Sequence, residues 1–84
     1  MSYIIVPSKA KNKKYAAIVT DSHGKKKTVN FGDSRFEQYR DSTNIGKYAN
    51  KDHSDIKRRE NYYKRHGKDA VKYSAKWFSH KYLW

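Results

Sequence analysis

Cations and aromatic rings alternate through the second half of this chain. The run from Lys51 to Gly67 places lysines and arginines among tyrosines and histidines, and the run from Lys76 to Trp84 adds tryptophan and phenylalanine. This pattern constrains the fold because the rings must pack inward while the charged heads stay in water. A surface that remains so basic is typical of a protein that meets a polyanion. We therefore expect a protein that binds rather than one that reacts.

The length allows one domain, which we place at residues 1–84. A domain of this size buries only about 60 to 65% of the surface of its unfolded chain, so a few large side chains must supply the core. The eight tyrosines, three phenylalanines and two tryptophans provide that bulk.

The charge is strongly positive throughout. Lysine and arginine number 20 against 8 acids, a net charge of +12, and both halves of the chain share the excess. Self-repulsion of this kind lowers the stability of the free protein and is relieved when phosphates or an acidic surface neutralise it. There is no cysteine, which excludes disulfides and thiolate metal sites. No apolar run approaches the roughly 20 residues of a membrane span, so we expect a soluble protein with no membrane partner.

The first half of the chain predicts β-structure. Residues 1–14 read as a short strand at Tyr3–Val6 followed by a cationic loop at Lys9–Lys14. Residues 15–31 read as a β-hairpin, because Asp21–Gly24 has the composition of a turn between two segments rich in β-formers. Lys25, Lys26 and Lys27 would then lie at its tip.

The hairpin leads into a segment with weaker signals. Asp33 or Ser34 could cap a short helical turn that holds Phe36, Gln38 and Tyr39. The polar segment Asp41–Gly46 reads as an exposed loop.

Residues 52–84 predict two helices. The first runs from Asp52 or His53 to His66, with Asp52 as N-cap and Gly67 as the residue after the C-terminal end. The second opens at Asp69 or Ser74 and ends near Tyr82. The expected fold class is therefore α+β, a small antiparallel hairpin or three-stranded sheet packed against two C-terminal helices.

Helical periodicity predicts which side chains face the core. In the first helix Ile56 and Tyr63 share a face, with Arg59 beside them as a candidate for a buried ion pair with Asp55. Glu60 can pair with Lys64 in the same way. In the second helix the apolar stripe consists of Val71, Ala75, Phe78 and Tyr82, and we expect Trp77, Leu83 and Trp84 to join the core.

The remaining cations form the candidate nucleic-acid site. In the first helix Lys57, Arg58 and Arg65 have no acidic partner that the sequence makes obvious, and lysine-rich surface without a sequence-reading motif predicts contact with phosphates. The candidates are Lys25, Lys26, Lys27, Lys57, Arg58, Lys64, Arg65, Lys68, Lys72 and Lys76. A solvated hairpin tip and a solvated helix face remain the alternatives. Stacking of single-stranded bases on Tyr62, Tyr73 or Trp77 is a further one.

Catalytic and metal sites find little support. His53, His66 and His80 have no spacing that would direct two of them to one metal. The eight acids are scattered, whereas a Mg²⁺-dependent nuclease needs clustered carboxylates. We expect no enzyme activity and no cofactor.

Several spaced elements resemble a family of small basic virion-associated proteins, of unassigned function, from nucleocytoplasmic large DNA viruses, the giant viruses. They are Val29 to Tyr39, Asn50 to His53, Arg58 to His66 and Trp77 to Trp84, so that the resemblance covers about residues 25–84. It implies a protein packaged in the virion and present in host cytoplasm or nucleus during infection.

Together these observations predict a non-enzymatic protein that contacts the phosphates of double-stranded DNA with low sequence specificity, for genome packaging, compaction or early infection. The alternative is a minor capsid or cement protein whose cations meet acidic capsid surfaces and which self-associates as a homo-oligomer.

Overall fold

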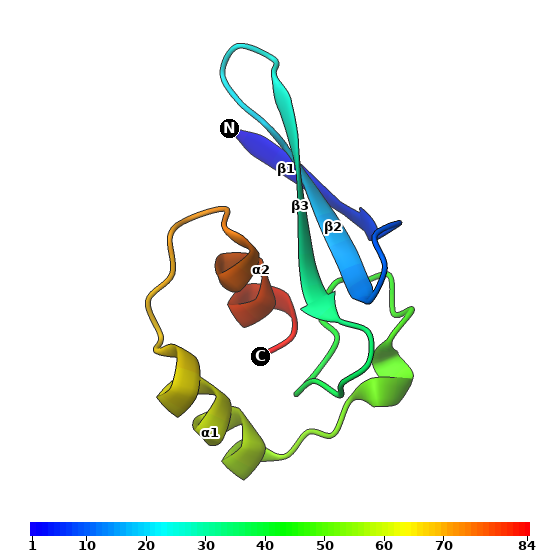
Figure 1. The fold of residues 1–84 in the computed structure, drawn as a ribbon, viewed down its shortest axis with the longest axis vertical. Coiled ribbons are helices and arrows are strands. Elements are labelled where there is room, and N and C mark those ends of the chain that lie inside the picture. The colour runs from blue at the N-terminus through cyan, green and yellow to red at the C-terminus, as the bar shows by residue number, and fades with distance from the viewer.

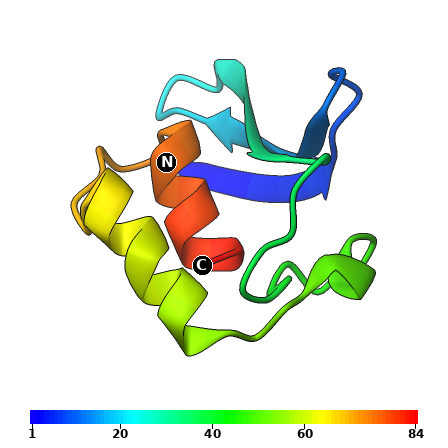
Figure 2. The ribbon, with the colours of Figure 1, turned by 60° about the horizontal axis from the view of Figure 1, so that its bottom comes forward.

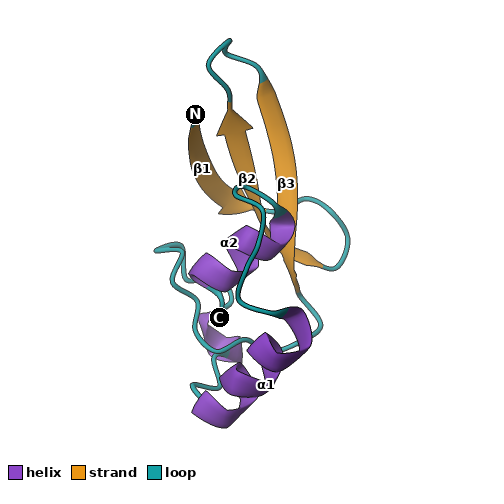
Figure 3. Ribbon diagram, turned by 90° about the vertical axis from the view of Figure 1, so that its left-hand side faces the viewer, coloured by secondary structure: helices purple, strands orange, loops and turns teal.

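The computed structural model describes residues 1–84 and has two parts, a sheet and a helical layer. A three-stranded antiparallel sheet with the order β1-β2-β3 comes first in the chain, and the helices follow (Figures 1 and 3). In chain order the elements are β1 (Ser2–Pro7), β2 (Lys13–Thr20), β3 (Lys26–Asp33), the short 3-10 helix η1 (Ala49–Lys51), α1 (Ile56–His66) and α2 (Ala75–Tyr82). The predicted α+β class is confirmed.

The sheet is a simple meander whose register follows the predicted hairpin. Tyr15 pairs with Phe31, and Ala17 pairs with Val29 on one side and Ile5 on the other. The turn between β2 and β3 is closed by Asp21, whose carboxylate accepts hydrogen bonds from the backbone of His23 and Lys25. Both the first strand and the hairpin are therefore confirmed, and they extend beyond the predicted bounds by one and two residues, respectively, at each end.

The core is aromatic and lies between the sheet and α2. Alternate residues of β2, namely Tyr15, Ala17 and Val19, are buried against Phe31 and Phe78. The rings of Phe31 and Phe78 are stacked with centroids 5.5 Å apart. Side chains of this size supply the apolar burial that so small a domain needs.

The C-terminal residues complete this core as predicted. Phe78 and Leu83 are fully buried, and Trp77, Tyr82 and Trp84 are half-buried against them. Val71 and Ala75 are the exceptions, because both are exposed, Val71 by 80%. The place of Val71 in the predicted stripe is wrong because α2 begins only after Ser74, which caps the backbone N–H of Trp77, and Tyr73 has a positive φ that no continuing helix allows. Ala75 is the first residue of α2 and does not face the core.

The first helix lies beside α2 and the C-terminal residues rather than on the sheet (Figure 2). Its buried residue is Tyr62, whose ring stacks on Trp84 at 4.3 Å and whose hydroxyl lies 3.0 Å from His80 Nδ1. The predicted face is wrong, since Ile56 is 62% exposed. A mostly polar helix that packs against the aromatic C-terminal residues buries one ring against them, and here that ring belongs to Tyr62 rather than to Tyr63.

The start of α1 also differs from the prediction. The helix begins at Ile56, and its N-cap is Asp55, whose carboxylate accepts from the backbone N–H groups of Lys57 and Arg58. Asp52 does not cap it, because its carboxylate accepts instead from Gln38 Nε2 and from the backbone N–H of Asp41. The predicted end at His66, followed by Gly67 at a φ of 72°, is confirmed.

The segment between β3 and η1 does not form the predicted helical turn. It is irregular, and hydrogen bonds from Gln38 to residues on either side of η1 hold it in place. Gln38 is fully buried and forms an isolated bridge with Asp52, while Phe36 points into solvent. Thr43 is buried as well, because its hydroxyl donates to Asp41, so the expected exposure of the whole 41–46 loop is wrong. Polar side chains can be buried here because each finds a hydrogen-bond partner.

Candidate nucleic-acid interface

The structure divides the predicted cations between two ends of the molecule. Lys25, Lys26 and Lys27 follow the β2–β3 turn, which projects far from α1 along the longest dimension of the molecule, 42 Å (Figure 1). Arg58, Lys64, Arg65 and Lys76 instead surround one cavity between the helices. Lys57, which lines neither group, is exposed on α1, and Lys68 is exposed just beyond its end.

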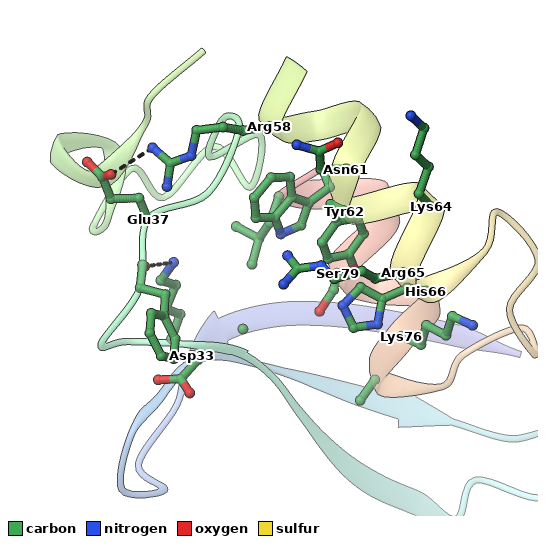
Figure 4. Close-up of a pocket in the computed structure, with 16 residues that line it drawn as sticks. Asp33, Glu37, Arg58, Asn61, Tyr62, Lys64, Arg65, His66, Lys76 and Ser79 are labelled. Atoms are coloured by element: carbon green, nitrogen blue, oxygen red, sulfur yellow. Dashed lines mark hydrogen bonds and ion pairs between the residues drawn. The ribbon is translucent and has the colours of Figure 1, made fainter. Parts of the chain in front are cut away.

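The cavity, here called the helix cleft, has a volume of about 1010 Å³. It lies between α1, α2 and the segment Gly32–Glu37 (Figure 4). Its lining is basic and aromatic with two acids: Lys14, Arg58, Lys64, Arg65, His66 and Lys76, then Phe36, Tyr62 and Trp84, and finally Asp33 and Glu37. Figure 4 shows Arg65 extending into this space from α1, with Lys64 and Lys76 farther toward one end.

Both acids of the helix cleft are neutralised by arginines. Arg35 forms an ion pair with Asp33 at 2.8 Å, and Arg58 forms one with Glu37 at 3.0 Å. The hydrogen bond from each arginine lowers the pKa of its carboxyl partner. These are the two ion pairs of the whole structure, so Lys64, Arg65 and Lys76 have no carboxylate partner. The helix cleft therefore presents a net positive field to solvent.

Arg58 is not the unpaired cation that the sequence predicted. Its ion pair with Glu37 reaches across a sequence separation of 21 residues, which local helical spacing does not show. Both side chains are about half exposed, and such pairs contribute only about 0 to 1 kcal/mol. An incoming phosphate can therefore compete for this guanidinium.

Arg59 fixes the helix, although not through the predicted ion pair with Asp55. Its Nε donates to the main-chain oxygen of Trp84 at 2.6 Å, and its guanidinium lies over the rings of Tyr39 and Tyr63. The carboxylate of Asp55 is occupied by the N-terminus of α1. The expected pair of Glu60 and Lys64 is likewise not formed. Arg59 is thus a structural cation and not a phosphate ligand.

Lys14 belongs to the inner wall of the helix cleft, which the sequence did not indicate. Predicted in an exposed loop, it lies in β2 and is only 2% exposed. Its Nζ donates to the carbonyl oxygen of Phe36 at 2.7 Å and also to Gln38 Oε1. The ammonium is buried because these acceptors replace its water, so Lys14 holds the 36–38 segment in place.

Burial gives Lys14 a measurable pH signature. Desolvation, with a smaller contribution from Lys51, lowers its pKa from 10.5 to about 8. Between these values the unfolded chain binds more protons than the folded one, so the contribution of Lys14 to the free energy of unfolding rises by about 2 kcal/mol from pH 8 to pH 10. Three tyrosines oppose this rise near pH 10 and make stability fall above it, because burial raises the pKa values of Tyr62 and Tyr82 to about 12 and also raises that of Tyr15.

Urea unfolding at pH 8, 9 and 10 tests this prediction. We expect the rise in the wild type and its loss in Lys14→Met, which keeps an unbranched side chain only one atom shorter and removes the charge. The same rise in both proteins would show that general charge repulsion, and not Lys14, produces it.

The second basic group lies in a smaller groove of about 480 Å³ at the hairpin end. Lys25, Lys26, Lys27 and Lys72 line it together with apolar side chains that include Met1 and Val71. The structure thus brings the predicted tip lysines together with Lys72, and it places them away from the helix cleft.

The three aromatics considered for base stacking are engaged within the protein. Tyr62 is covered by Trp84 and His66. Trp77 packs edge-on against neighbouring rings and has Lys81 Nζ 5.5 Å from its centroid, and Tyr73 lies under Lys72. Their faces are therefore not open platforms for single-stranded bases.

No helix is both long enough and apolar enough to cross a membrane. No three histidine, aspartate or glutamate side chains come together as a group that could hold a metal ion.

Comparison with known proteins gives one family and no characterised relative. No curated protein and no solved structure matches the chain significantly. Residues 3–66, which include the sheet, the Gly32–Glu37 segment and α1, match a family of unknown function, DUF5754. Since this match covers well over half of its residues, the chain belongs to the DUF5754 family.

Proposed function

We propose that this protein binds double-stranded DNA through its phosphates, with the helix cleft as the principal contact. The observation that carries the proposal is the pairing of both acids in the helix cleft, Asp33 and Glu37, which leaves Lys64, Arg65 and Lys76 unpaired around one opening. Unpaired cations gathered on one surface gain most from a ligand whose charge is regularly spaced, and duplex DNA carries one charge per roughly 1.7 Å of its axis.

Low sequence specificity is part of the proposal. Base-edge readout depends on bidentate side chains carried into a groove by a helix or ribbon, and the chain has none of the motifs that do so. Arg58, Lys64 and Arg65 lie within the exposed part of α1, where they suit phosphate contacts instead. Lys25, Lys26, Lys27 and Lys72 would supply a second phosphate contact at the hairpin end.

The viral setting stays a prediction from the sequence resemblance. A protein packaged in a virion with the genome would use such phosphate contacts for packaging, compaction or early infection, and it would need no enzyme activity. The helix cleft and its cations are equally compatible with a duplex of any origin.

A capsid or cement protein is the second candidate function. It is favoured by the sheet face that α2 does not cover, where Ile4 is 60% exposed and is paired in register with Ile18. On a chain of net charge +12, exposed apolar side chains such as Ile4 mark a place where two copies could associate with fewer cations in contact.

Competition with heparin tests the proposed function against generic charge attraction. We expect a random-sequence duplex to bind more tightly than heparin or single strands compared at equal charge, because the unpaired cations occupy fixed positions. Heparin that displaces the duplex as readily as unlabelled duplex does would reduce the interaction to nonspecific attraction. The capsid function would then become the leading candidate.

A further inference from the structure

Phe36 is the one exposed ring in an otherwise inward-facing set of aromatics. Among eight tyrosines, three phenylalanines and two tryptophans it alone is exposed, at 63%. It lines the helix cleft, where the unpaired cations lie. A single exposed apolar side chain is ordinary on a protein surface, so its significance depends on how it is held.

The backbone on both sides of Phe36 is fixed. Its N–H donates to the carbonyl oxygen of Asp33 at 3.1 Å, and its own carbonyl oxygen accepts from the buried Lys14 at 2.7 Å. Two residues later, the buried Gln38 side chain donates to the main-chain oxygen of Tyr48 and to Asp52. The ring is thus presented to solvent from a rigid support, which lowers the entropy lost when a ligand covers it.

The charges next to Phe36 favour a nucleic acid over an acidic protein surface. The guanidinium of Arg35 lies over one face of the ring, 5.6 Å from its centroid, and the neighbouring Glu37 is neutralised by Arg58. Unlike Tyr73 and Trp77, Phe36 packs against no other ring and stays 63% exposed, so that a base can still reach it. A flat apolar ring flanked by cations complements a nucleobase flanked by phosphates. Aromatic side chains gain about 1 to 3 kcal/mol by stacking on a base.

We propose that Phe36 is the base-contacting residue of this protein, stacking on a nucleobase while the cations of the helix cleft hold the flanking phosphates. The proposal rests on the proposed function and deepens it. The base could come from a duplex step opened by the ring as a wedge, which kinks the DNA, or from a base that is already unpaired.

The test measures binding of Phe36→Ala, Phe36→Leu and Phe36→Trp to an intact random duplex and to the same duplex with one unpaired base. We expect Phe36→Ala to bind roughly 5- to 150-fold more weakly, with an unchanged salt dependence because no phosphate contact is lost. Phe36→Trp should retain affinity. Ile4→Ala is the matched control, because Ile4 is similarly exposed but lies on the far face of the sheet.

Phe36→Leu distinguishes the two sources of the base. A wedge into an intact duplex tolerates leucine, whereas stacking on an unpaired base requires a ring. Thermal unfolding of each variant should match the wild type, which excludes loss of the fold as the cause.

Two different failures can be told apart. If the wild type binds neither DNA, the proposed function itself falls. If the wild type binds and Phe36→Ala binds both DNAs as the wild type does, the phosphate-binding function stands and the role of Phe36 is overturned.

Discussion

Reversing two charges in the helix cleft, Arg65→Glu with Lys76→Glu, should weaken duplex binding at least about 100-fold and leave the fold intact. Each side chain would otherwise contribute a charge-assisted hydrogen bond to phosphate of about 1.5 to 3 kcal/mol. Neither has a carboxylate partner and both are exposed, so their replacement leaves no buried group unsatisfied. Fluorescence anisotropy with a labelled random duplex measures the affinity, and circular dichroism measures the fold.

The control is Lys47→Glu with Lys81→Glu, which changes the net charge by the same amount. Both lysines are exposed and lie outside the helix cleft. If this control loses as much affinity as the first double variant, binding depends on net charge and the helix cleft is not the site. If neither loses affinity but Arg65→Glu with Lys76→Glu fails to enter particles, the capsid function is favoured.

Gly32→Ala should lower the free energy of unfolding by about 2 to 5 kcal/mol. Gly32 lies in β3 with a φ of 76°, which costs an L-residue about 1 to 2 kcal/mol. In addition, a Cβ atom there would lie 2.7 Å from Leu83 Cδ1 and 3.2 Å from Lys14 Cβ. Both neighbours are buried and cannot move away cheaply, so a further 1 to 3 kcal/mol of overpacking is expected. Denaturant unfolding gives the value.

Gly24→Ala separates the two causes. Gly24 has nearly the same φ, 79°, and nothing lies within 4 Å of the Cβ that alanine would add. Gly24→Ala should therefore lower the free energy of unfolding only by the cost of the positive φ, about 1 to 2 kcal/mol. Equal losses at the two positions would contradict the close packing of Leu83 against β3, on which the inner wall of the helix cleft depends.

The sheet and the C-terminal core were predictable because their signals are local. Two segments rich in β-formers and the turn residues between them indicated the hairpin, and the apolar end of the chain contained Phe78 and Leu83. The start of α1 was missed because Asp52 and Asp55 are equally good caps in sequence. Asp55 is the cap because the carboxylate of Asp52 instead accepts a hydrogen bond from the distant side chain of Gln38.

The helix cleft was predictable in part. Arg58, Lys64, Arg65 and Lys76 were recognised as cations with a surface role, but not as one group, because α1 and α2 must pack before their cations meet. Lys14 was missed because a lysine in a basic stretch normally stays in water, and its burial depends on acceptors 22 and 24 residues away. The pairing of Glu37 with Arg58 and the exposure of Phe36 are also products of tertiary structure.

The salt dependence of binding to a random duplex tests the central claim most directly. We expect the cations of the helix cleft and the hairpin end to make about five to eight phosphate contacts. The logarithm of the association constant should then fall linearly with the logarithm of salt concentration, with a slope of about −4.5 to −7. Arg65→Glu with Lys76→Glu should bring this slope about two units closer to zero. A slope near zero, or a steep slope that the double variant leaves unchanged, would contradict phosphate binding by the helix cleft.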